Sequence, residues 1–88
     1  MDVVLPDPFT PTTTIAFDLA RRQRVELALY DVAGRRVRTL ADGFQDAGRH
    51  GIVWDGTDDA GFPLASGTYL VRLRADARVH VGKVMLTR

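Results

Sequence analysis

Apolar and polar residues alternate along most of this chain, and a period of two is typical of half-buried β-strands. Ile15, Phe17 and Leu19 share one face of the first such segment, and the residues between them share the other. No window has the periodicity of an amphipathic helix. The pattern predicts strands at residues 12–20, 24–30, 35–40, 49–54, 69–74 and 79–86.

About seven short strands separated by turn signals predict an all-β fold, an antiparallel immunoglobulin-like β-sandwich. Residues 31–34 predict a type I turn that closes a hairpin, with Gly34 in the left-handed position. Ser66 and Gly67 predict a turn before the next strand, and Asp76 and Ala77 predict the turn of the last hairpin.

Three places break the regular pattern. Val37 and Leu40 fall on opposite faces of their strand, which predicts a bulge or an early strand end. Asp42–Gly43 and residues 46–48 predict a loop after that strand. In the last strand the apolar positions switch from Val79 and Val81 to positions 84 and 86, so a bulge is predicted at residues 82–83.

The first eleven residues differ from the rest because they carry Pro6, Pro8 and Pro11. Proline lacks an amide donor and favours extended geometry in the residue before it. Residues 1–11 are therefore predicted to be an extended lead-in or linker, in which residues 3–5 could pair at a sheet edge. Residues 12–88 are predicted to form the β-sandwich itself.

Composition narrows the class of protein. Eighty-eight residues predict one domain with a modest core, and the absence of cysteine removes disulfides and thiolate metal sites. A net charge of +1 gives no reason to expect nucleic-acid binding. The sequence has neither a membrane-length apolar run nor a signal peptide. We expect either an intracellular protein or a segment of a longer one.

An Asp-rich stretch follows Trp54, and two interpretations of it are open. Asp55, Thr57 and Asp59 have the spacing of the first half of an EF-hand calcium loop. However, Ala60 stands where that loop needs glycine, and Ser66 stands where it needs a bidentate glutamate. We expect that the Asp side chains bond to the amides of their own loop, with weak calcium binding as the alternative.

The remaining candidate residues predict no catalytic site, no cofactor and no metal, so the chain is not expected to be an enzyme. His50 and His80 lack further ligands at metal spacing, and we expect both in solvent, with His80 pointing outward. Trp54 shares the parity of Ile52 and is expected in the core rather than as a stacking platform. A carbohydrate-binding module would need exposed aromatics, for which Tyr30, Phe44 and Phe62 are too scattered in sequence.

Several motifs occur in the order found in one known group of modules. They are PDPFTPTTTI at residues 6–15, VELALYDVAGRRVRTL at 25–40, AGRH at 47–50, WDG at 54–56, SGTY at 66–69 and KVMLTR at 83–88. The chain resembles the type IX secretion C-terminal sorting domain and its relative, the immunoglobulin-like domain of the flagellar hook-capping protein. It departs from the pattern at Asp7, where asparagine is usual, and at residues 19–21.

The resemblance implies a non-catalytic sorting and anchoring module that follows a passenger protein. Its partners would be an outer-membrane translocon and a sortase, and the precursor would reach the cell surface or medium through the periplasm. A structural spacer or assembly module without a sorting role is the alternative. By resemblance, the residues expected to be recognised by the translocon are Gly67, Tyr69, Lys83, Val84, Met85, Leu86, Thr87 and Arg88.

Overall fold

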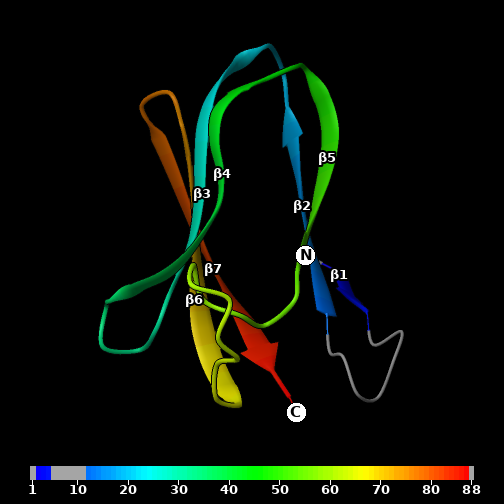
Figure 1. Ribbon diagram of the computed structural model, residues 1–88. Helices are drawn as coiled ribbons and strands as arrows, with labels where there is room; N and C mark the ends of the chain where they lie inside the picture. The colour runs from blue at the N-terminus through cyan, green and yellow to red at the C-terminus, as the bar shows by residue number, and fades with distance from the viewer. Residues whose placement is uncertain (1, 5–11, 88) are drawn as a thin grey trace.

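The computed structural model describes residues 2–4 and 12–87, which form two antiparallel sheets packed face to face (Figure 1). One sheet has three strands in the order β1-β2-β5, and the other has four in the order β4-β3-β6-β7. The predicted immunoglobulin-like sandwich is thereby confirmed. The strands are β1 (Asp2–Val4), β2 (Thr12–Leu19), β3 (Gln23–Tyr30), β4 (Arg36–Gln45), β5 (Gly48–Trp54), β6 (Gly67–Ala75) and β7 (Arg78–Leu86).

The lead-in lies only partly within the described residues. Asp2–Val4 pairs with the start of β2, with Val3 opposite Thr13. The other residues of the predicted lead-in, 1 and 5–11, lie outside the described part of the chain. Within that part, no helix has the length and apolar character needed to cross a membrane.

The core lies between the two sheets and consists of the alternating apolar residues that the sequence pattern predicts. Trp54 is 1% exposed, so its predicted place in the core is confirmed. Its indole N–H donates to the Thr57 carbonyl at 2.9 Å, and its ring meets that of Tyr69 edge to face at 5.4 Å. The other members of the core cluster are Ile15, Phe17, Leu19, Val25, Leu27, Leu29, Val71, Ala75, Val84 and Leu86.

The β4 strand is longer and more irregular than predicted. Its pairing with β3 shifts register twice, and the predicted irregularity between Val37 and Leu40 is confirmed as bulges. Because each bulge adds a residue, Val37 and Leu40 both pack against the core. The predicted loop at Asp42–Gly43 is wrong, since both residues continue the strand. Asp42 is tolerated there because its carboxylate accepts a hydrogen bond from Arg24 of β3 at 2.8 Å.

The predicted bulge at residues 82–83 is also wrong. β7 pairs with β6 in one register over its whole length, and even-numbered positions face the other sheet throughout. Val79 and Val81 therefore lie on the outer face, 47% and 65% exposed. His80 does not point outward as predicted, because it shares the inner face with Val84 and lines the space toward β2.

Candidate functional site

The Asp-rich segment 55–66, here called the corner loop, is held together largely by its own hydrogen bonds. The Asp55 carboxylate accepts bonds from the Thr57 hydroxyl at 2.6 Å and the Thr57 amide at 3.1 Å. The Asp58 carboxylate accepts bonds from the amides of Ala60 and Phe62, at 3.0 and 2.9 Å. These bonds confirm, for Asp55 and Asp58, the prediction that the Asp side chains bond to amides of their own loop. The Asp59 carboxylate departs from it, because it accepts a bond from the Thr39 amide of β4.

The same bonds determine what the corner loop can do chemically. The hydroxyl hydrogen bond from Thr57 is the main cause that lowers the pKa of Asp55, and the nearby Arg38 charge adds to it. Asp55 therefore stays a carboxylate and is not suited to donate a proton. Among residues 2–4 and 12–87, no three acidic or histidine side chains converge as metal ligands.

Arg38 of β4 holds the corner loop against the four-stranded sheet, a role that sequence reasoning missed. Its guanidinium donates to the Thr57 hydroxyl at 2.7 Å and to the Asp58 carbonyl at 3.1 Å. It also lies 3.7 Å from the Asp55 carboxylate and 4.0 Å from that of Asp59. The available signal was an arginine inside a strand between the apolar residues Val37 and Leu40, but its partners lie about twenty residues away.

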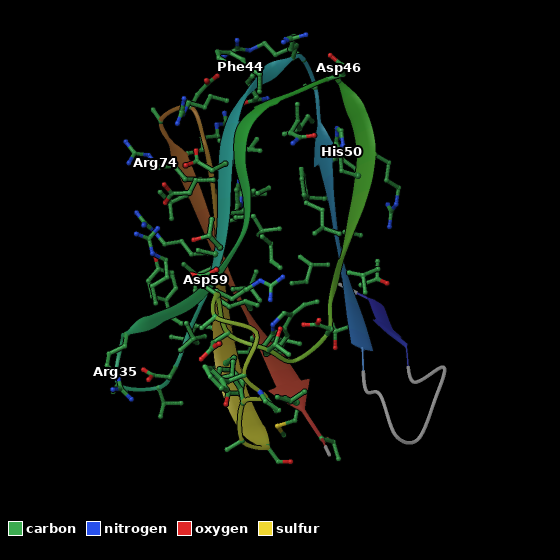
Figure 2. The ribbon with its side chains drawn as sticks, in the orientation of Figure 1. Arg35, Phe44, Asp46, His50, Asp59 and Arg74 are labelled. Carbon is green, nitrogen blue, oxygen red and sulfur yellow. The ribbon has the colours of Figure 1, made fainter. Side chains whose placement is uncertain are left out.

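Two further bonds attach the corner loop to the β4 backbone. The Thr39 amide donates to the Asp59 carboxylate at 2.9 Å, and the Asp59 amide donates to the Val37 carbonyl at 3.0 Å. Figure 2 shows Asp59 beside the point where β4 bends. The corner loop thus covers part of the β4 edge and satisfies backbone groups there.

The structure brings the expected recognition residues of β6 and β7 together as one strand pair. Gly67 lies opposite Leu86, and Tyr69 lies opposite Val84. Tyr69, Val84 and Leu86 are buried, and the Tyr69 hydroxyl donates to the Ala65 carbonyl at 2.6 Å. The outward positions of the tail are Lys83, Met85 and Thr87, whereas Arg88 lies outside the described residues.

The two histidines differ in their surroundings. His50 stacks on Phe17 with 5.2 Å between ring centroids, and its Nε2 lies 2.7 Å from the Asp46 carbonyl. Figure 2 shows His50 beside β2 and β5, and its stacking on Phe17 joins these two paired strands of the three-stranded sheet. His80 lies on the exposed part of β7 at the open side of the sandwich.

Comparisons with known proteins agree with this architecture. Residues 6–78 match the sequence model of the FlgD Ig-like domain. The solved structure of FlgD from P. aeruginosa is similar, with a TM-score of 0.66 and 27% sequence identity. That match covers 97% of this chain and 66% of the P. aeruginosa chain. No curated protein matches the chain.

Proposed function

Because the chain belongs to the FlgD Ig-like domain family, we propose that it is a structural module in assembly of the flagellar hook. The observation that carries the proposal is the family match over residues 6–78, supported by a shared fold along 97% of the chain. The module is non-catalytic, as is usual for an Ig-like structural domain. It would supply a rigid body with shaped surfaces to a longer hook-capping protein.

The geometry suits such a role. The corner loop is tied to β4 by Arg38 and to β6 by Tyr69, so this end of the sandwich presents a fixed shape. Buried side-chain polar atoms of the described residues all have hydrogen-bond partners.

A domain exchange tests the proposal. The chain would replace the matching part of FlgD from P. aeruginosa, and hook formation would be scored by electron microscopy in cells lacking the native protein. We expect hooks to form, and the same chimera carrying Trp54→Ala should fail because its core is lost. A folded, stably expressed chimera that forms no hooks would contradict the role.

The second candidate function is sorting of a passenger to the cell surface through an outer-membrane translocon and a sortase. It is favoured by the pairing of Gly67–Tyr69 with the tail, which joins the residues expected to be recognised. Deleting the tail would be a poor test, because Val84 and Leu86 belong to the core. A better test changes only the outward residues Lys83, Met85 and Thr87.

In that experiment, a fluorescent passenger carrying the module is followed in a bacterium with a type IX system. We expect Lys83→Glu with Met85→Ser and Thr87→Asp to retain the fold and to reduce export at least about tenfold, because the altered face is the one a receptor could reach. Export that is unchanged in a folded variant would remove the sorting role. It would leave the hook-assembly proposal intact.

A further inference from the structure

The outer strand of the four-stranded sheet, β7, is an open edge. It pairs with β6 over nine positions, from Ala75 opposite Arg78 to Gly67 opposite Leu86, without a register shift. On its other side no strand of the described residues pairs with it. A long regular edge offers a row of amide and carbonyl groups to another extended chain.

Two of the other three sheet edges are protected in ways that β7 is not. β4 has two register shifts and is covered in part by the corner loop, and β1 has only three residues. The third edge, β5, is regular and leaves Val53 59% exposed, but on the same outward face Arg49 pairs with Asp18. β7 instead exposes Val79, Val81 and Met85, at 47, 65 and 63%.

A groove runs beside this edge, between β7 and β2, on the side of the sandwich where the sheets do not close. Its volume is about 410 Å³, and its lining includes Ile15, Phe17, Leu73, His80, Val81 and Gly82. Gly82 leaves room on the inner face of β7. A strand added beside β7 would place alternate side chains in this groove and the others on the outer face, because side chains alternate along a strand.

The outer face next to the open edge is basic. Arg72 and Arg74 of β6 lie opposite Val81 and Val79, and Lys83 follows on β7. Within the described part of the chain, none of these three cations forms an ion pair, although Glu26 of β3 lies opposite Arg74. Figure 2 shows Arg74 pointing away from the three-stranded sheet.

We propose that β7 accepts an extended segment of another protein as a fifth strand, and that this segment alternates aliphatic and acidic residues. Its aliphatic side chains occupy the groove against Phe17 and Leu73, and its carboxylates face Arg72, Arg74 and Lys83. A second copy of this chain fits less well, because it brings the basic residues of its own β7. The site does not depend on the hook-assembly role, since it rests on the edge itself.

A peptide titration tests the site. The probe is a capped eight-residue peptide of alternating valine and aspartate, added to the isotope-labelled chain and followed by amide NMR shifts up to about 1 mM. We expect shifts centred on residues 78–83 of β7. A peptide with lysine in place of aspartate should bind at least about tenfold more weakly, and added salt should reduce the difference.

Matched variants identify the edge that binds. Val81→Glu places a carboxylate on the edge and should abolish binding of the acidic peptide, whereas Val53→Glu on β5, a similarly exposed position, should leave it unchanged. Arg72→Glu with Arg74→Glu should reverse the preference toward the lysine peptide. Both valine variants should keep a dispersed amide spectrum.

Four outcomes would overturn the proposal. They are the absence of shifts in β7, shifts that map to β4 or β5, equal binding of the two peptides, and concentration-dependent shifts in β7 without peptide, which would indicate self-pairing. Each is distinct from failure of the domain exchange, because the titration needs no flagellar component.

Discussion

The two outer strands of the four-stranded sheet, β4 and β7, differ in how their unpaired backbone groups are covered. β4 bends through two bulges and receives the corner loop, which takes up the Thr39 amide and the Val37 carbonyl. β7 stays regular and uncovered, with valines on its outer face. A domain that only needed to be stable would be expected to protect both edges. The difference indicates that one edge is closed for stability and the other is available for contact.

The largest expected loss of stability comes from removing the Arg38 hydrogen bonds that hold the corner loop on β4, here called the Arg38 clamp. Arg38→Met keeps most of the aliphatic stem but loses the bonds to Thr57 and Asp58. We expect a loss of about 2 kcal/mol in the free energy of unfolding, because charged hydrogen bonds at a part-buried site are lost together. Urea denaturation measures this, and Arg36→Met, on an exposed neighbour, is the control. Equal stability of the two variants would show that the clamp contributes nothing.

A smaller loss of stability is expected at the end of the corner loop near Ala65, where it is bonded to β6. Tyr69→Phe removes only the hydroxyl that donates to the Ala65 carbonyl and leaves the ring against Trp54. We expect a loss of about 1 kcal/mol, since exposed Ala65 can bond to water instead. Thermal unfolding measures the change, and Tyr30→Phe on β3 is the matched control. A loss larger than that of Arg38→Met would reverse the order proposed for the two anchors.

Lowering the pH should destabilise the closed edge, β4 with its corner loop, before it destabilises the open edge, β7. The pKa of Asp55 is lowered in the folded state, so its contribution is present above the unfolded value near 3.8 and is lost as pH falls through the folded value. Amide shifts of residues 55–59 followed from pH 6 to about 2 measure this. Asp55→Asn should remove much of the pH dependence in the loop. An unchanged titration in that variant would assign the effect to another group.

The smallest effect is expected on the open edge. Val81→Glu should change the free energy of unfolding by less than about 0.5 kcal/mol, because position 81 is exposed and contacts little of the core. Chemical denaturation beside the unaltered chain measures it. A loss above about 2 kcal/mol would mean that Val81 supports the fold, and the peptide results for this variant would then report folding.

Much of this comparison could be predicted from the sequence, and the exceptions have physical causes. The alternation of apolar and polar residues correctly predicted that Trp54 and the other core residues are buried. It is reliable where the opposite sheet covers a strand, because every second residue must then be apolar. It failed at Val79 and Val81, since the sandwich is open there and the inner positions are His80 and Gly82. The Asp42–Gly43 signal for a loop failed because a neighbouring strand supplies Arg24 as a partner.

The candidate site was less accessible to sequence reasoning. The self-bonded corner loop could be predicted because its bonds join residues two to four apart. The Arg38 clamp could not, since it depends on where β4 passes the loop in space. The open edge of β7 depends on strand order, which the alternation of residues does not specify.

Native-state amide hydrogen exchange on both edge strands is the most direct test of whether β4 is closed and β7 is open. We predict that the Thr39 amide exchanges at least about tenfold more slowly than the alternate amides of residues 78–82 that point away from β6. Arg38→Met should speed Thr39 and leave β7 unchanged. Slow exchange at every amide of β7 in the free chain would contradict an open edge.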